Sequence, residues 1–420
     1  MPLTRETRVL AISAPLHLLT HMLTLLFPAV ALPVSREFSV PPAEVIAMGF
    51  PMYFLYGVLA LPAGYLADRW SKIAILKVCA AGMTICVFAA GSSSTLAGFA
   101  ASLTLLGVFC SLYHPAGLGL ISSQIGRQGR AHGTNGVFGN IGIGMAPLFA
   151  GAVLMAANWR WVYTACGFLG LAALALIYAL EVEEKKGAPA PLAAVGESRA
   201  HNAKYFAILL AAMTMAGLIY RANSVALPPL FETSGGGALA DAVAYVSDRL
   251  GRDAGSGAAA MIVSTLFIFS VAGQIAGGRV ADGMDLRHGY IAFHLAAALF
   301  IFLVSRSSGM AMYMAAAGMV FFNLGIQPVE NSLIASFIPG RWISTGYGIK
   351  FTFTFGVGSL AVAQVAWAEE TIGLKNLYSI MALEAVAAAG CAVWLLAATR
   401  GLARIGASGV QPPAGGKFSG

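Results

Sequence analysis

The sequence has few charged residues. Only 10% of its 420 residues are Asp, Glu, Lys or Arg, whereas a soluble domain carries about a quarter. The chain is instead 58% hydrophobic, with a mean hydropathy of +0.77. This composition excludes a soluble domain and predicts a polytopic α-helical membrane protein, because a helix satisfies its own backbone in lipid. The ten-residue segments of alternating polarity that are typical of a membrane β-barrel are missing from the sequence.

Several chemical signatures are missing as well. The five cysteines lie in apolar segments without a Cys-x-x-Cys pair, which predicts buried small side chains instead of a disulfide or a zinc site. The sequence contains no Gly-x-x-x-x-Gly-Lys-Ser/Thr loop for ATP. It also shows no nucleophile–base group of an enzyme. We therefore expect a protein that is not an enzyme, that binds no metal or cofactor, and that uses a proton gradient as its energy source.

Apolar runs long enough to cross a bilayer, about 20 residues each, recur through nearly the whole chain. The first run follows two arginines as a signal peptide would, but it ends without a convincing cleavage site and is expected to be retained. We predict twelve transmembrane helices, at 9–33, 44–67, 73–91, 95–124, 131–156, 160–180, 204–231, 257–281, 288–305, 309–337, 342–367 and 376–400.

The distribution of positive charge predicts the orientation. Placing both termini in the cytoplasm puts most of the 25 Lys and Arg residues on that side, as the positive-inside rule requires. An even number of spans agrees, because it places both termini on one side. The bacterial inner membrane is the expected location. The net charge of +7 is explained by this asymmetry, so we expect membrane lipid and a small-molecule substrate as partners, and no nucleic acid.

The predicted spans fall into two groups of six. Residues 1–180 are expected to form one six-helix bundle and residues 204–400 a second. Residues 181–203, rich in Glu, Lys, Ala, Pro and Gly, form a cytoplasmic linker, and residues 401–420 form a disordered cytoplasmic tail. In the longest external connection, residues 238–250 could form a short amphipathic surface helix.

The two groups of spans repeat each other. Repeated halves in a polytopic protein indicate a transporter whose substrate binds near the midplane, between the halves. The matching pairs, in order, are Phe27-Pro28 with Leu227-Pro228, Gly64–Asp68 with Gly278–Asp282, His114-Pro115 with Gln327-Pro328, and Gly126-Arg127 with Gly340-Arg341.

Residues 9–400 resemble the major facilitator superfamily. The loop after the second span follows that family's Gly-x-Leu-Ala-Asp-Arg-x-Gly pattern, with Ser71 in place of the last glycine, and a degraded copy follows the eighth span. The resemblance implies twelve helices in two pseudo-symmetric six-helix bundles. It also implies a gate at the cytoplasmic ends of the halves, whose residues are Gly64, Asp68, Arg69, Lys72, Gly278 and Asp282. The Asp68 carboxylate could accept hydrogen bonds from a facing helix N-terminus or pair with arginine. The alternative is a solvated turn.

The fifth span is rich in glycine. It resembles the glycine–proline motif of the family's antiporters, and the alternative is close helix packing by small residues. With His17-x-x-x-His21 and the segment 112–118, this span also resembles fosmidomycin-resistance-type exporters. The residues of the motif are Gly139, Gly142, Gly144, Pro147 and Gly151.

Six ionisable residues lie inside predicted spans, where each is a candidate functional residue. We place them on the substrate and proton pathway: His17, His21, His114, Arg221, Glu330 and Lys350. By resemblance, spans 1, 4, 7 and 10 line the central cavity, and five of the six residues fall on these spans. Glu330 is the leading proton carrier, because protonation of a buried carboxyl can be linked to conformation. The alternative is a static ion pair with Lys350 or Arg221.

The other candidates suggest the kind of cargo. Histidine titrates near neutral pH and could share the proton relay or serve in packing. His17 and His21 lie one helical turn apart, but the sequence offers no third metal ligand near them. Arg221 and Lys350 exceed Glu330 by one positive charge, which favours an anionic or zwitterionic substrate.

These observations predict a proton-coupled secondary active transporter that works by alternating access. The glycine-rich fifth span favours export of small organic molecules, anionic ones included, by proton antiport. The first alternative is a proton symporter that imports a small organic or anionic solute. The second is a transport-inactive membrane receptor or assembly protein on the same fold. We expect a monomer.

Overall fold

The computed structural model describes residues 4–184, 199–234, 252–402 and 404–406, and four single positions between residues 241 and 248. Over these residues the regular structure is helical and contains no strand. Most of the predicted linker, most of the predicted surface helix at 238–250 and most of the predicted tail lie outside the described residues.

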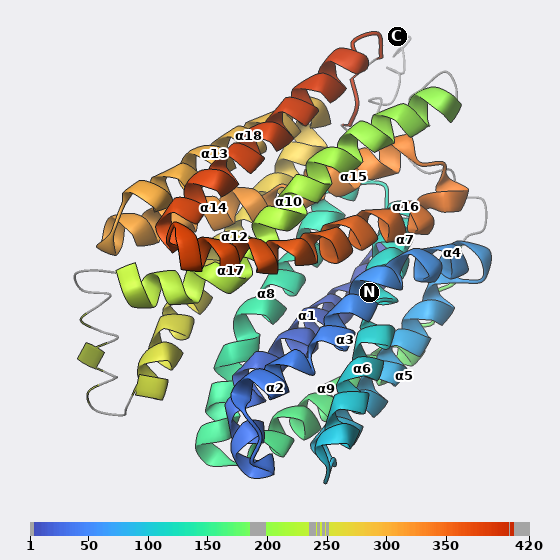
Figure 1. Ribbon diagram of the computed structural model, residues 1–420. Coiled ribbons are helices and arrows are strands. Elements are labelled where there is room, and N and C mark those ends of the chain that lie inside the picture. The colour runs from blue at the N-terminus through green and yellow to red at the C-terminus, as the bar shows by residue number, and fades with distance from the viewer. Residues whose placement is uncertain are drawn as a thin grey trace, which may run out of the picture.

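The first half of the chain forms one bundle, drawn from blue to green in Figure 1. Its first helix is capped by Thr4, whose side chain accepts a hydrogen bond from the Thr7 backbone N–H. The helices of this half are α1 (Arg5–Phe38), α2 (Pro42–Ala47), α3 (Phe50–Val58), α4 (Ala60–Arg69), α5 (Lys72–Gly91), α6 (Leu96–Cys110), α7 (Tyr113–Gln124), α8 (Gln128–Ala156) and α9 (Trp159–Ala179).

The second half forms the bundle drawn from yellow-green to red in Figure 1. Its described elements are α10 (Arg199–Ser234), α12 (Arg252–Gly283), α13 (Leu286–Arg306), α14 (Gly309–Gly325), α15 (Gln327–Phe337), η1 (Gly340–Trp342), α16 (Ile343–Phe351), η2 (Thr352–Gly356), η3 (Val357–Leu360), α17 (Ala361–Thr371) and α18 (Leu374–Ala398).

Eleven helical segments of the described chain are long and apolar enough to cross a membrane, and α3 with α4 makes a twelfth span that is bent by 41°. This confirms the predicted all-helical membrane fold. The second span was expected to run unbroken over 44–67, but α2, α3 and α4 divide it. Pro62 explains the bend, because it has no N–H to donate to the Val58 carbonyl.

Two further spans are interrupted at the repeated X-Pro pairs. Helix α7 begins at Tyr113, directly before His114-Pro115, and α15 begins at Gln327-Pro328. A proline removes one backbone hydrogen bond of the helix, and for Pro328 the carbonyl left over is that of Leu324. That carbonyl accepts a hydrogen bond of 2.9 Å from the Gln274 side chain of α12. The breaks place His114 and Glu330 in the first turns of new helices, midway along their spans.

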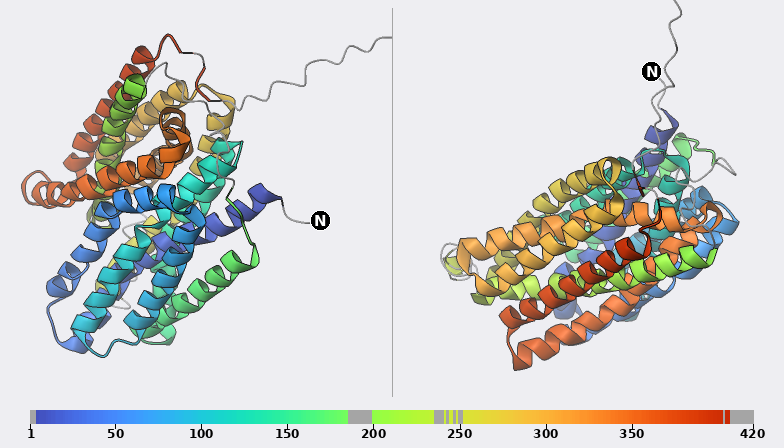
Figure 2. Two further views of the ribbon diagram at one scale, coloured as in Figure 1. Left: turned by 90° about the vertical axis from the view of Figure 1, so that its right-hand side faces the viewer. Right: turned by 90° about the horizontal axis from the view of Figure 1, so that it is seen from above.

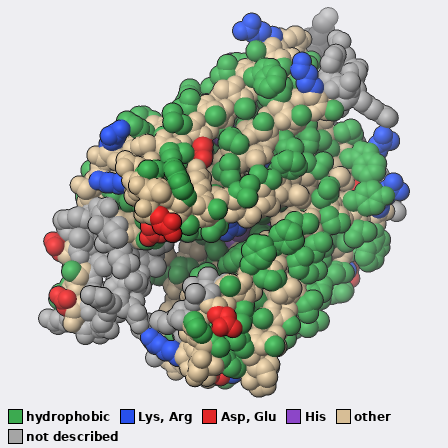
Figure 3. Space-filling view, viewed as in Figure 1, with side chains coloured by type: hydrophobic (Ala, Val, Ile, Leu, Met, Phe, Trp, Pro, Cys, Tyr) green, Lys and Arg blue, Asp and Glu red, His purple; other side chains and the backbone are tan. Residues whose placement is uncertain are grey.

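The two bundles lie side by side, as the two further views show (Figure 2). They pack on each other through α8 against α12 and through α4 and α7 against α16. On the outer face seen in Figure 3, hydrophobic side chains cover most of the surface and most Lys and Arg side chains lie toward its edges. This distribution suits a protein surrounded by lipid, with its charges in the interfaces.

Candidate functional site

A cavity of about 80 Å³ lies between the two bundles, enough for several water molecules. Many polar side chains reach it from both halves, although the spans themselves are strongly apolar. Its polar lining includes His17, His21, His114, His132, Asn135, Asn140, Gln274, Asn323, Gln327, Glu330 and Asn331. A well-formed pocket in which polar groups converge among apolar walls is the default binding site of a fold.

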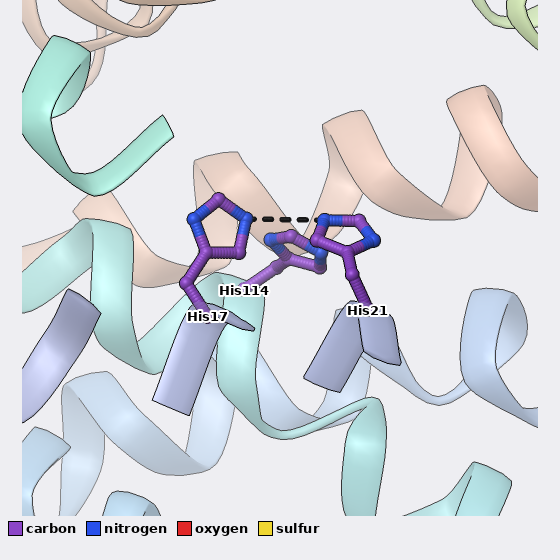
Figure 4. A group of neighbouring side chains, drawn as sticks. All are labelled: His17, His21 and His114. Carbon is purple, nitrogen blue, oxygen red and sulfur yellow. Dashed lines mark hydrogen bonds between the residues drawn. The ribbon is translucent and has the colours of Figure 1, made fainter. Parts of the chain in front are cut away.

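Three histidines form a cluster on one wall of this cavity. His17 and His21 project from α1 and His114 from α7, and the three rings point toward one another (Figure 4). The Nε2 atoms of His17 and His21 are 3.1 Å apart and share a hydrogen bond. The ring of His114 lies 5.1 Å from each of the other two, measured between centroids. The first and fourth spans thus bring together residues that are almost 100 positions apart.

The position of His17 depends on its neighbours in α8. Its Nδ1 lies 2.7 Å from the backbone carbonyl oxygen of Asn135, which can only accept, so Nδ1 carries the proton and Nε2 has the lone pair. Gly139 makes room for the ring, because a Cβ atom there would lie 2.5 Å from Cε1 of His17. A glycine of the fifth span therefore provides the space that a ring of the histidine cluster occupies.

A buried ion pair lies on the opposite wall of the cavity. The Lys350 ammonium is 2.6 Å from the Glu330 carboxylate, and each side chain is 1% exposed. Lys350 also donates to the amide oxygens of Gln327 and Asn331, at 3.0 and 2.8 Å. The Tyr290 hydroxyl donates to the second carboxylate oxygen of Glu330, at 3.1 Å. All three donors of the ammonium and both oxygens of the carboxylate therefore have partners, as a buried ion pair requires.

Arg221 lies apart from this pair. It is absent from the cavity lining, and its guanidinium lies 5.6 Å from the centre of the Tyr53 ring in the other half. Four of the six predicted intramembrane residues therefore line the cavity. Lys350 is held against it through its pair with Glu330, and Arg221 lies outside it. Lys350, whose charge is matched by Glu330, leaves no surplus positive charge at this wall.

A hydrogen-bonded chain closes the cavity on one side. The Ser122 hydroxyl in α7 lies 2.7 Å from the Tyr347 hydroxyl in α16 and 3.0 Å from Nε2 of His132. The Tyr347 hydroxyl also donates to the Asn331 carbonyl, at 2.9 Å. The contact between Ser122 and Tyr347 crosses from one bundle to the other.

Beyond this chain lies the end of the molecule that holds the two repeated loops, which we call the motif end. Asp68 accepts hydrogen bonds from the backbone N–H groups of Ser344 and Thr345, at 3.0 and 2.7 Å, and from the Thr345 hydroxyl, at 2.8 Å. These groups open α16, so the carboxylate of one half caps a helix of the other half. Lys72 flanks the same carboxylate at 3.7 Å.

The second copy of the loop makes the equivalent contact in the opposite direction, from the second half to the first. Asp282 accepts hydrogen bonds from the backbone N–H groups of Gly129 and Arg130, at 3.0 and 3.2 Å, at the start of α8. Close approach is possible because Gly278 faces the Gly129 carbonyl, where a Cβ atom would lie 2.9 Å from the oxygen. The repeat in sequence is therefore a repeat in contacts.

The remaining gate candidates also lie at this boundary. Gly64 faces the backbone of Ser344, with no space for a side chain between them. Within the described part of the chain Arg69 forms no ion pair with an aspartate; its guanidinium lies over the rings of Tyr65, at 5.1 Å, and Trp342, at 5.5 Å. A cation over an aromatic ring of the other half adds to the contact.

The glycines of the fifth span do not share one role. Gly142, like Gly139, faces α1, where it meets the Leu18 backbone. Gly144 faces α12, where a Cβ atom would lie 3.1 Å from that of Phe267, and Gly151 has nothing within 4 Å. Pro147 lies inside α8.

An ion pair at the opposite end ties α1 to α9. Arg160 lies 2.6 Å from the Glu37 carboxylate, and the Trp159 indole N–H donates to the same group at 2.7 Å. The hydrogen bond from Arg160 lowers the pKa of Glu37 below its usual range. This pair joins only helices of the first half.

Sequence reasoning missed several polar residues of the site. His132, Asn135, Gln274 and Asn331 line the cavity, and an unpaired polar residue within an apolar span was the signal that could have found them. It also missed Glu384 in α18, which accepts a hydrogen bond of 2.6 Å from the Gln364 side chain and lies away from the cavity.

Two repeated helical bundles with a polar cavity between them define the class of the protein, a membrane transporter. The family model described as the Major Facilitator Superfamily matches residues 17–363, and the chain belongs to this family. The family members are transporters and not enzymes, as expected. No curated protein matches the chain.

Solved structures share the fold. The proton:xylose symporter XylE is 14% identical, with a TM-score of 0.71 over 91% of this chain and 94% of its own. FucP in the outward conformation is 13% identical, with a TM-score of 0.70 over 93% and 99%. The human organic anion transporter MFSD10 is 12% identical, with a TM-score of 0.69 over 93% and 100%.

Proposed function

We propose that this transporter is coupled to protons through Glu330 and Lys350. The observation that carries the proposal is the fully buried ion pair on the cavity wall. A carboxylate at a cavity and the ammonium paired with it, both buried in an otherwise apolar bundle, are costly to keep. Their charge balance changes whenever Glu330 takes up a proton or cargo binds to either partner, so proton and cargo occupancy are linked.

Alternating access follows from the contacts at the motif end. Asp68 and Asp282 each cap a helix of the opposite half, and both contacts must break before the halves separate there. We propose that this end is cytoplasmic, in agreement with the positive charge of its loops, and that the conformation described here is closed to the cytoplasm. The outward conformation of FucP, which has a similar fold, supports this assignment.

We propose export by proton antiport as the direction. The glycine–proline segment of α8 and the resemblance to fosmidomycin-resistance-type exporters support it. In antiport, cargo and proton compete, and the group they compete for is the Glu330 carboxylate. A cargo that donates hydrogen bonds or positive charge to Glu330 would displace the proton and then leave when the proton returns. The protein acts as a monomer in the bacterial inner membrane.

Proton symport of an anion is the second candidate, and Lys350 favours it. An anionic group that pairs with Lys350 releases Glu330, and a buried carboxylate without a partner takes up a proton. Anion and proton would then move together. XylE, described as a proton:xylose symporter, and MFSD10, described as an organic anion transporter, share the fold, and both descriptions are compatible with this candidate.

Reconstituted protein distinguishes the two directions. Proteoliposomes carrying the purified transporter are given a pH step, and movement of a labelled phosphonate, fosmidomycin, is followed. Movement against the proton flux supports antiport and export; movement with the protons supports symport and rules out antiport. Absence of any movement for this probe, followed by a thermal-shift screen of organic solutes at two pH values, would exclude fosmidomycin as cargo. Loss of all flux in Glu330→Gln, with flux in wild type, excludes a transport-inactive protein.

A further inference from the structure

The histidine cluster has the composition of a metal site. His17, His21 and His114 are all buried, and each offers one ring nitrogen such that the three atoms lie within 4.8 Å of one another. Imidazole nitrogen is the ligand that first-row transition ions such as Zn²⁺, Co²⁺ and Cu²⁺ prefer. Sequence reasoning set a metal aside because no third ligand lay nearby, and the fold supplies it from α7.

The cluster leaves hydrogen-bonding capacity unused. Both ring nitrogens of His114 are buried and have no hydrogen-bond partner among the described residues. Native proteins leave few buried polar atoms unpaired, and each such atom calls for an explanation such as an ion or a water. The ring of His114 stacks on Phe351 of the other half, with centroids 4.1 Å apart, so the ring itself is held in place while its nitrogens are free to ligate.

The neighbouring groups prepare His17 to act as a ligand. Its Nδ1–H donates to the Asn135 carbonyl, which leaves the lone pair of Nε2 directed at His21. A second hydrogen bond of this kind fixes the tautomer of metal-bound histidines in general. Gly139 holds the space for the ring, so the position of the ligand is set by α8 as well as by α1.

The charge around the cluster permits a cation. Lys350 is the cationic group at the opposite wall, and its ammonium is paired with Glu330 at 2.6 Å. The pair has no net charge, so a divalent ion on the first wall meets no uncompensated positive charge there.

We propose that His17, His21 and His114 bind one first-row divalent transition metal ion, with a fourth coordination position open to the central cavity. Nitrogen ligands about 2.0–2.1 Å from a tetrahedral ion lie about 3.3 Å from one another. The Nε2 atoms of His17 and His21, 3.1 Å apart, already meet this spacing. The nitrogen of His114 lies within 4.8 Å of the others and needs a shift of up to about 1.5 Å to reach it.

The position of the ligands determines how the ion would act. All three come from the first half, so the ion stays with that half when the bundles rock, and it does not lock them together. Three protein nitrogens with one open position are typical of zinc sites that bind a further group. Water or an anionic group of the cargo can take that position from the cavity.

Metal binding by the purified full-length protein tests the proposal without a transport assay. The protein is prepared without a polyhistidine tag, stripped of metal in detergent, and titrated with Co²⁺, whose visible absorption reports tetrahedral nitrogen coordination; Zn²⁺ is then added in competition. We expect one ion per chain and displacement of cobalt by zinc. His114→Ala should weaken binding at least tenfold, since loss of even an outer-shell partner costs 10–100-fold.

His294→Ala is the matched control, because His294 is equally buried but lies in the second half against Tyr290. It should bind cobalt as wild type does. The proposal is overturned if wild type gives no saturable tetrahedral signal, or if His114→Ala binds as tightly as wild type. If His114→Ala does not purify as a single species, His21→Asn replaces it as the test variant. In addition, the spectra of Cu²⁺ bound to wild type must show coupling to three nitrogens. A smaller number also overturns the site.

Discussion

Glu330→Gln separates a proton-coupling role from a static one. The substitution keeps the shape of the side chain and removes its charge, so Lys350 stays buried with neutral amide oxygens as partners, those of Gln327 and Asn331 among them. At the 2.6 Å separation of the pair, an effective dielectric constant of about 20 gives an attraction of about 6 kcal/mol. Desolvation offsets part of this, and breaking one partner of a buried pair costs about 3–5 kcal/mol.

The expected results differ between stability and transport. The thermal midpoint of Glu330→Gln should fall by roughly 5–10 °C. Lys350→Met should show a similar fall, because it leaves the carboxylate unpaired. The double variant should recover most of the loss, since it removes both buried charges. Proton flux should be absent from the two variants that lack the Glu330 carboxylate, including the stable double one, if Glu330 carries the proton.

The assays are thermal unfolding in detergent and proton flux into dye-loaded proteoliposomes. A loss in the double variant equal to the sum of the two single losses would show that the two charges are not coupled. Undiminished proton-coupled flux in Glu330→Gln would refute the assignment of Glu330 as carrier, and the search would move to the histidine cluster. Tyr290→Phe is the control, because it removes one hydrogen bond of 3.1 Å to the carboxylate and leaves both charges in place.

Three further predictions concern other parts of the fold. Asp68→Asn should shift the population toward opening at the motif end, as measured by spin-label distances, and should do so more than Asp282→Asn, because Asp68 accepts three hydrogen bonds from the other half and Asp282 two. Gly139→Ala should destabilise the protein by about 1–3 kcal/mol, seen in thermal unfolding, because the new Cβ meets the histidine ring. In wild type the ion pair of Glu37 with Arg160 stabilises the fold fully above the ordinary glutamate pKa, and this stabilisation is lost as the pH falls through the lowered pKa of Glu37. Glu37→Gln should remove it.

Each of these has its own check. Unchanged distances in both aspartate variants would show that the capped helices do not hold the motif end closed. Gly151→Ala, at a position with nothing within 4 Å, should leave stability unaltered, and a loss equal to that of Gly139→Ala would contradict the steric argument. Thermal midpoints of wild type and Glu37→Gln should converge at acid pH. A difference between the two midpoints that stays constant down to acid pH would contradict the predicted pH dependence of the ion pair.

The membrane class, the number of spans and the repeat could be predicted from the sequence. Hydrophobicity over about 20 residues is a local property, and lipid forces each such run into a helix that satisfies its own backbone. The loop Gly64–Lys72 was predictable for a similar reason, because its order of glycine, carboxylate and cations is contained in nine consecutive residues. The positions of the breaks at Pro62, Pro115 and Pro328 could also be predicted from the local sequence. The angle of 41° between α3 and α4 could not.

The partners of those residues required the tertiary structure. Nothing in the sequence pairs Asp68 with the start of α16, places Glu330 against Lys350 and away from Arg221, or adds His114 to the two histidines of α1. Helix packing decides these contacts, since small shifts in helix rotation bring different faces into a cavity. The sequence by itself determined which charged residues lie within the membrane spans. Only the packing of the two halves decided which of them meet, because each contact joins residues from spans that are far apart along the chain.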